Sequence, residues 1–402
     1  MSGAASAFGG TSAKGWFGLT SAALTAVVVG FASTILLIME AADAVGANPD
    51  EKASWAAALC IGQAITTLML SWRYRMPIIT AWSTPGAALI ATSTSAGIDY
   101  PGAIGAFIAA GLLMCLTAMF KPVARAIERI PASIAAAMLA GVLLRYSMGV
   151  PGAAIELPWQ VLPLIAVFFA LRVWQPFFAV PVVVAAGIAL AAATGAFEAG
   201  CCSLGVTEPV WTTPRFDWPI IVGIGLPLYL VTMASQNLPG FAVLKASGYQ
   251  PPVRGPLWVT GIASVVFAPF GAHQLNLAAI TASIVTGPEA HPDPHKRWLV
   301  AWPYLVLYIL VGLAAASFVA ILGSLPKPLI TAIAGLALFA PLLGSATAMF
   351  KEKEQIEAAL ATFLVSASGI AVYGVGAPFW GLVAGLVLHG ARHLRSMKQL
   401  NG

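Results

Sequence analysis

Charged residues are scarce in this sequence. Asp, Glu, Lys and Arg make up 9% of the 402 residues, and hydrophobic types make up 59%. A soluble domain carries about 25% charged residues, so a water-facing surface cannot be built here. This excludes a soluble enzyme, a nucleic-acid binder and a disordered scaffold. The apolar segments are continuous and do not alternate, which argues against a β-barrel. The composition predicts an all-α polytopic membrane protein embedded in a lipid bilayer.

Motifs for catalysis and metal binding are also lacking. The sequence has no HExxH motif, no Walker phosphate loop and no nucleophile elbow, so we expect no enzyme activity and no cofactor. The loop Glu289–His295 contains two histidines, but Pro292 and Pro294 prevent the helical spacing that would align them on a metal ion. We therefore expect no metal site.

Long apolar segments are what the sequence does contain. A membrane-spanning helix needs about 20 apolar residues, and several of the segments are shorter than that. Fourteen segments lie at 20–45, 54–72, 78–95, 102–120, 131–149, 158–172, 177–197, 218–245, 256–270, 271–286, 298–322, 328–349, 356–375 and 377–391. We predict about 14 transmembrane segments.

The basic residues indicate an orientation. If the N-terminus is cytoplasmic and the segments alternate, 16 of the 20 Lys and Arg residues fall on the cytoplasmic side. The other four, Lys52, Arg145, Arg215 and Lys327, fall outside. Cytoplasmic loops of membrane proteins carry such an excess of positive charge. The sequence therefore predicts that both termini are cytoplasmic.

The chain also resembles itself weakly. Ser83–Thr92 can be aligned with Gln274–Ser283 at an offset of 191, and Met39–Gly46 with Met233–Gly240 at an offset of 194. Seven segments per copy is an odd number, so the second copy would be inverted. This predicts 7+7 inverted repeats, residues 1–200 and 201–402. Chance is the alternative, because Ala-Ala pairs are common in apolar sequences.

Two interrupted segments predict the substrate site. Inverted repeats place such a site between broken helices near mid-membrane. Pro85 suits the first position of a half-helix, with Ser83 or Thr84 as its cap and an extended segment before it. Ala272–Asn276 would form the matching extended segment, with Asn276 as the cap. Two helix N-termini, each carrying about half a positive charge, would then attract one carboxylate. The alternative is a proline kink and a tolerated Asn in ordinary spans.

Other polar residues inside apolar segments are further candidates. Ser235, Gln236 and Asn237 stand in a row, which favours a cavity over a single helix–helix hydrogen bond. The ionisable residues within the segments are His273, Glu40 and Asp43, which makes them candidates for proton coupling. His273 ranks first because it lies deepest and titrates in the useful pH range, and Glu40 ranks second. Alternatively, Glu40 and Asp43 are solvated at the outer mouth, and His273 is hydrogen-bonded to the backbone.

Four motifs resemble the benzoate transporter family, the BenE-type proton symporters. They are Ala81–Leu89, Ala234–Gly240, Asn276–Thr281 and Gly287–Pro294. The family is related to nucleobase permeases and to sulfate and bicarbonate transporters. The resemblance implies a core domain of spans 1–4 and 8–11 and a gate domain of spans 5–7 and 12–14. It also implies a strand and half-helix in spans three and ten, with substrate between them and spans one and eight.

The sequence departs from the nucleobase permeases at two positions. Those relatives carry acidic residues in span eight and before the second half-helix, which align near Ser235 and at His273. The proton carrier is therefore a different group from theirs, or lies elsewhere.

Together, the residues and the resemblance predict a secondary-active transporter of the bacterial inner membrane that imports benzoate or a similar aromatic monocarboxylate with protons. The alternatives are a nucleobase or inorganic-anion carrier of the same fold and an uncoupled anion channel. A homodimer is one assembly that the resemblance suggests. The predicted substrate-binding residues are Phe31, Ser83, Thr84, Pro85, Gly86, Ser235, Gln236, Asn237, Gln274, Asn276 and Leu277.

Overall fold

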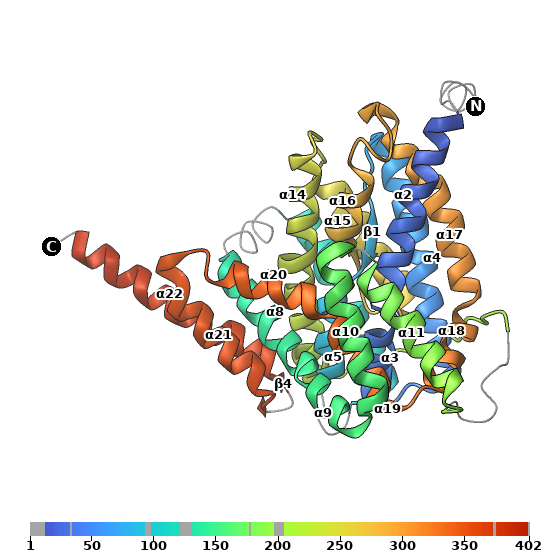
Figure 1. Cartoon of the computed structure of the whole chain (residues 1–402). Coiled ribbons are helices and arrows are strands. Elements are labelled where there is room, and N and C mark those ends of the chain that lie inside the picture. The colour runs from blue at the N-terminus through green and yellow to red at the C-terminus, as the bar shows by residue number, and fades with distance from the viewer. Residues whose placement is uncertain are drawn as a thin grey trace.

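A computed structural model describes residues 13–32, 34–92, 98–120, 131–176, 178–196, 205–372 and 375–400. The predicted boundary between the repeats, at residue 200, lies outside this part of the chain. Within it, six helices are long and apolar enough to cross a membrane, or seven if the bent pair Ala315–Gly323 and Lys327–Ala337 is one span. The protein is therefore a mostly helical, multi-pass membrane protein (Figure 1).

The first half of the chain begins with a broken helix, α2 and α3, on which the strand–helix unit β1–α5 packs. A capping box of Asn48 and Glu51 starts α4, and Asp99 caps α6. The elements are α2 (Ala13–Ala32), α3 (Ile35–Ala44), α4 (Pro49–Tyr74), β1 (Thr80–Trp82), α5 (Thr84–Thr92), α6 (Tyr100–Met119), α8 (Ala132–Ser147), α9 (Gly149–Glu156), α10 (Pro158–Trp174) and α11 (Ala179–Ala193).

The second half begins with one long helix that contains two π-helical turns, η1 and η2. Its elements are α12 (Trp218–Ile220), η1 (Ile221–Gly225), α13 (Leu226–Thr232), η2 (Met233–Asn237), α14 (Leu238–Ala246), α15 (Arg254–Phe267), η3 (Ala268–Phe270), β2 (Leu275–Leu277), α16 (Ile280–Val285), η4 (Pro294–Val300), α17 (Ala301–Leu313), α18 (Ala315–Gly323), α19 (Lys327–Ala337), α20 (Phe339–Met349), η5 (Lys353–Gln355), α21 (Ile356–Ser368), β3 (Ala371–Val372), β4 (Val375–Gly376) and α22 (Ala377–Leu400). Each predicted apolar segment coincides with a helix, a run of helices or a strand–helix pair.

Two short strands meet at the centre of the molecule. β1 pairs antiparallel with β2, with Ala81 opposite Asn276. Each strand leads into a half-helix, α5 or α16, so the predicted strand and half-helix segments are confirmed. The strands begin 195 residues apart and the half-helices 196 residues apart. The alignment of Ser83–Thr92 with Gln274–Ser283, at an offset of 191, is therefore displaced by about one helical turn. The alignment of Met39–Gly46 with Met233–Gly240, at an offset of 194, is close to the observed spacing.

Asn276 is not a helix cap, which corrects the sequence-based expectation. It lies in the middle of β2, and its side-chain nitrogen donates to the carbonyl of Leu277 at 2.8 Å. The half-helix α16 begins only at Ile280, and its N-cap residue, Ala279, has a methyl side chain that cannot form a hydrogen bond. Pairing with β1 extends the strand through Leu277, so the helix cannot start earlier.

An extended strap, residues 205–217, runs across one end of the bundle and bonds to both halves of the chain. The backbone N–H groups of Thr207, Thr212 and Arg215 donate to the carbonyls of Leu313, Pro269 and Pro101. The Arg215 side chain pairs with Asp217 and with Asp99, the cap of α6. Hydrogen bonds to these two carboxylates raise the pKa of the guanidinium.

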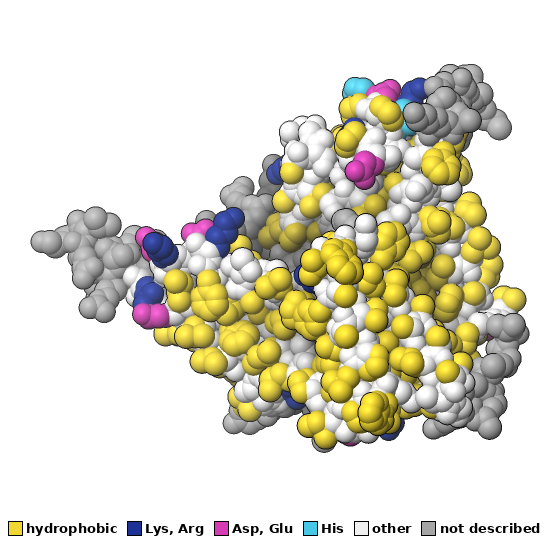
Figure 2. All heavy atoms as spheres, viewed as in Figure 1, with side chains coloured by type: hydrophobic (Ala, Val, Ile, Leu, Met, Phe, Trp, Pro, Cys, Tyr) yellow, Lys and Arg dark blue, Asp and Glu magenta, His cyan; other side chains and the backbone are white. Residues whose placement is uncertain are grey.

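The C-terminal helices α21 and α22 project from the main body (Figure 1). They pack on each other, and α21 also packs on α8. Ala137, Ala140, Met349 and Ala359 form a small separate core there, shared by α8, α20 and α21. On the face seen in Figure 2, hydrophobic side chains cover most of the surface, and charged ones gather at the upper end and on the C-terminal arm. An apolar surface of this extent is suited to contact with lipid.

Candidate functional site

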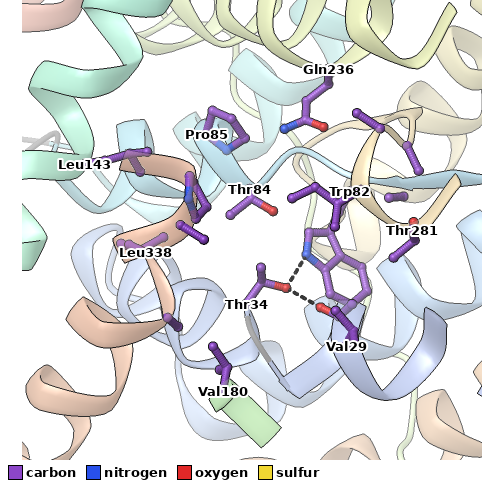
Figure 3. Close-up of a pocket in the computed structure, with 18 of the residues that line it drawn as sticks. Val29, Thr34, Trp82, Thr84, Pro85, Leu143, Val180, Gln236, Thr281 and Leu338 are labelled. Carbon is purple, nitrogen blue, oxygen red and sulfur yellow. Dashed lines mark hydrogen bonds between the residues drawn. The ribbon is translucent and has the colours of Figure 1, made fainter. Parts of the chain in front are cut away.

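A pocket of about 360 Å³ lies where the two half-helices approach the break between α2 and α3 (Figure 3). One wall comes from α2, α4, β1, α5, η2, α16 and α17, and the opposite wall from α8, α10, α11, α19 and α20. Pockets for small ligands commonly measure about 300–1,000 Å³ and are mostly apolar. The volume and lining therefore suit a small organic molecule.

The start of α5 forms one polar side of the pocket. Ser83 caps this helix, as predicted: its hydroxyl accepts from the N–H of Gly86 at 3.1 Å and from the hydroxyl of Thr232 at 2.7 Å. The next residues, Thr84 and Pro85, line the pocket (Figure 3). The positive end of the nine-residue helix α5 thus faces the cavity.

The π-helical turn η2 forms a second polar side. Ser235 and Gln236 line the pocket, and Gln236 lies beside Pro85 in Figure 3. The next side chain, Asn237, instead points to the strands, where its oxygen accepts from the N–H of Leu277 at 3.0 Å. This turn therefore directs Ser235 and Gln236 to the pocket and Asn237 to the strands. π-Helical turns are frequent at functional sites.

Aromatic rings form the apolar part of this wall. The indole of Trp82 lines the pocket, and its N–H donates at 2.9 Å to the hydroxyl of Thr34, which lies in the break between α2 and α3. Tyr308 also lines the pocket and meets Trp82 edge-on, with ring centroids 6.1 Å apart. Phe31 supports Trp82 from behind at 6.3 Å without lining the pocket itself.

Arg172 is the one charged side chain among the described residues that line the pocket. It stands in the last turn of α10, and its guanidinium lies 5.5 Å from the centre of the Phe339 ring. Sequence reasoning counted this arginine as part of the cytoplasmic charge and missed its place in the site. The available signal was its position at the very end of an apolar segment.

Several predicted binding residues lie behind the pocket rather than in it. A side chain at Gly86 would meet Leu228 of α13 at 2.4 Å, so this glycine permits close helix packing. The predicted residues that lie outside the pocket lining are Phe31, Ser83, Gly86, Asn237, Gln274, Asn276 and Leu277, whereas Thr84, Pro85, Ser235 and Gln236 lie within it.

The three candidates for proton coupling have different surroundings. His273 is fully buried; its Nε2 bonds the carbonyl of Ser83 at 2.9 Å, and its Nδ1 accepts from the indole N–H of Trp55 at 3.1 Å. These two partners fit the neutral ring, because Nδ1 must be an acceptor and Nε2 a donor. Asp43 is exposed and pairs with Lys52. Glu40 is half-buried, and its Oε2 is buried without a hydrogen-bond partner among the described residues.

Comparison with known proteins identifies the family. Residues 18–391 match the family model of the benzoate membrane transport protein, BenE. The chain belongs to the BenE family of membrane transporters. It is 39% identical to the inner membrane protein YdcO of Escherichia coli and 31% identical to a benzoate membrane transport protein of Acinetobacter baylyi. Each alignment covers 92% of this chain and 94% of the relative.

Solved structures show the same fold at low sequence identity. The transmembrane domain of the cyanobacterial bicarbonate transporter BicA matches with a TM-score of 0.59 and 13% identity, over 93% of this chain and 98% of that one. The murine anion transporter Slc26a9, in its inward-facing state, matches with a TM-score of 0.62 and 14% identity, over 94% of this chain and 68% of that one. The BenE family member described here therefore has an SLC26-like transporter fold.

Proposed function

We propose that this BenE family member imports benzoate or a similar aromatic monocarboxylate together with protons. The observation that carries the proposal is the composition of the pocket: a cavity of about 360 Å³ with apolar and aromatic walls, the N-terminus of α5 and one arginine, and no acidic side chain among its described lining residues. This combination suits a ligand with one negative charge and an apolar ring.

The two parts of the ligand would occupy different parts of the pocket. The carboxylate would lie against Thr84 and Gln236, where a hydroxyl and an amide can donate hydrogen bonds at the positive end of α5. The ring would lie on Trp82, with Phe168 and Leu143 on the opposite wall. Arg172 approaches from that wall and adds positive charge from outside the half-helix.

The alternative cargoes fit this pocket less well. An inorganic anion would leave the aromatic and aliphatic walls without a role. A neutral nucleobase would gain nothing from Arg172 or from the positive end of α5. An uncoupled channel is distinguished from a carrier by counterflow, since a carrier exchanges labelled for unlabelled substrate.

We propose that the two walls of the pocket belong to two different domains, the core and the gate that the resemblance implies. In this proposal α2–α6 and α12–α18 form the core and α8–α11 and α19–α22 form the gate, within fourteen segments arranged as 7+7 inverted repeats. The antiparallel pairing of β1 with β2 and the similar spacing of α5 and α16 support this arrangement. Movement of one wall past the other would open the pocket to each side of the membrane in turn.

Glu40 is our first candidate for the coupling proton, ahead of His273. An ionised carboxylate with a buried, unpartnered oxygen is costly, so the protonated form is favoured in this conformation. Protonating His273 would place a new N–H against the N–H of Trp55. The helix of Glu40, α3, packs directly on α5, which links its protonation state to the pocket.

Uptake of labelled benzoate into proteoliposomes tests the proposal. We expect accumulation when the outside is acidic, little accumulation without a gradient, and counterflow in both conditions. Uracil and sulfate should not compete with benzoate. Competition by either compound at the concentration of benzoate itself, or the absence of any benzoate counterflow, would contradict the proposed substrate.

A further inference from the structure

The inner end of the pocket contains polar groups that a benzoate ion would leave unused. Gln63 of α4 lines the pocket and is fully buried, yet neither its side-chain nitrogen nor its oxygen has a hydrogen-bond partner among the described residues. Thr281, in the first turn of α16, also lines the pocket, and its hydroxyl is buried without a hydrogen-bond partner among the described residues. Buried polar groups are usually paired, so two such side chains in one cavity point to a ligand.

These groups gather around Tyr308. Gln63 and Tyr308 both line the pocket. The carbonyl of Gln63 accepts from the hydroxyl of Thr80, whose own carbonyl accepts from the Tyr304 hydroxyl. The centre of the Tyr304 ring lies 4.7 Å from that of Tyr308. A side chain built at Gly30 would meet the Tyr308 hydroxyl at 2.7 Å and the Thr281 methyl group at 3.3 Å, which places both against the same point of α2. Gln63, Thr281 and Tyr308 therefore form one polar cluster, which we call the Gln63 cluster.

The Gln63 cluster lies away from the proposed carboxylate position. In Figure 3, Thr84 and Thr281 lie on either side of Trp82. Tyr308 meets the edge of the same indole from α17. A ligand whose carboxylate contacts Thr84 and Gln236, and whose ring lies along Trp82, would direct the far edge of its ring toward the Gln63 cluster.

We infer that this transporter prefers aromatic monocarboxylates with a hydroxyl group in the meta or para position over benzoate itself. The phenolic hydroxyl would donate to the Gln63 oxygen and accept from the Gln63 nitrogen or from Thr281. A site built to hydrogen-bond a substrate hydroxyl discriminates against the analogue that lacks it, because its own polar groups are then left unpaired. This inference rests on the proposed function and specifies its substrate class.

Competition in counterflow tests the inference with four probes: benzoate and 2-, 3- and 4-hydroxybenzoate. In the unaltered protein, we expect the better of the 3- and 4-isomers to compete about tenfold more strongly than benzoate, as one good hydrogen bond allows. The 2-isomer is an internal control, because its hydroxyl lies beside the carboxylate and cannot reach the Gln63 cluster.

Gln63→Leu removes the amide while keeping a similar volume. We expect the preference for the 3- or 4-isomer to fall about tenfold, with benzoate competing at least as strongly as before, because it no longer leaves a buried amide unpaired. The melting temperature of the unliganded variant, compared with that of the unaltered protein, checks that the variant is folded. Thr281→Val should reduce the preference in the same direction. Gln236→Leu is the matched control: it should weaken all four probes by a similar factor and leave their ratios unchanged.

The outcomes separate this inference from the proposed function. If benzoate is exchanged but the ratios are the same in Gln63→Leu and in the unaltered protein, the inference is wrong and the proposed function stands. The same conclusion follows if benzoate competes as well as the best hydroxybenzoate in the unaltered protein. If none of the four compounds is exchanged or shifts the melting temperature, the proposed function itself fails.

Discussion

Replacing Glu40 with Gln should separate transport from the proton gradient. Glu40 lies in α3, with one oxygen buried and unpartnered among the described residues. Ionising such a group in place is unfavourable, because the buried oxygen has no donor to stabilise its charge among the described residues. Its proton should therefore stay bound in this conformation and leave when movement of the walls exposes the carboxylate. Gln keeps the shape and the polarity but cannot release a proton.

The size of the effect follows from the charges that move. Benzoate entering with one proton carries no net charge, so a gradient of one pH unit, about 1.4 kcal/mol, supports about tenfold accumulation. Without the proton, a membrane potential of 100 mV, negative inside, opposes the anion by about 2.3 kcal/mol, which is about fifty-fold exclusion. In Glu40→Gln, we expect accumulation driven by the pH gradient to disappear while counterflow continues near its original rate.

Gradient-driven uptake and counterflow should be measured on the same reconstituted variants. Asp43→Asn is the matched control on the same helix, because that carboxylate is exposed and paired with Lys52; it should remain coupled. His273→Gln tests the other candidate with a side chain that can still donate to Ser83 and accept from Trp55. If Glu40→Gln accumulates benzoate like the unaltered protein, or if His273→Gln alone loses coupling, the assignment to Glu40 is refuted.

Three further predictions concern the pocket and its support. Arg172→Gln should weaken benzoate binding, measured by calorimetry, by about 1–2 kcal/mol and should make binding less dependent on salt concentration. The control is Arg392→Gln, because Arg392 pairs with Glu357 outside the pocket. Gln236→Ala should weaken binding by about 1–3 kcal/mol if it bonds the carboxylate, and an unchanged affinity would move the carboxylate elsewhere. Ser83→Ala should lower the melting temperature for two reasons: it removes the cap of α5, worth about 1 kcal/mol, and it removes the acceptor of the buried Thr232 hydroxyl. A melting temperature equal to that of the unaltered protein would contradict this role.

Local signals in the sequence predicted the half-helix α5 but not its counterpart. Ser83 and Pro85 specify a helix start by their own chemistry, and the structure confirms this start. At Asn276 the same reasoning was wrong, because the start of α16 depends on pairing with β1, about 195 residues earlier in the chain. Membrane character followed from composition alone, since it depends on every residue and on no particular contact.

The candidate site was predicted only where neighbouring residues define it. Thr84, Pro85, Ser235 and Gln236 lie in motifs that stand out in the sequence, and all four line the pocket. Gln63 and Arg172 are ordinary residues in ordinary helices, and they reach the pocket only because of how α4 and α10 pack against distant segments. For Gly86, the reverse holds: its motif was recognised, but the tertiary structure turns it toward Leu228.

The strap over residues 205–217 restricts how this protein can move. It bonds to α17, to the segment before β2, and to α6, which together come from both halves of the chain. Any displacement of these elements against one another at that end would break several bonds at once, so they should behave as a single rigid body. Helices α8–α11 and α19–α22 receive no such bonds from the strap among the interactions of the described residues. The wall of the pocket formed by α8–α11 and α19–α22 is therefore the one that is free to move. In each transport cycle this wall would move past the ligand, while the other wall stays in place.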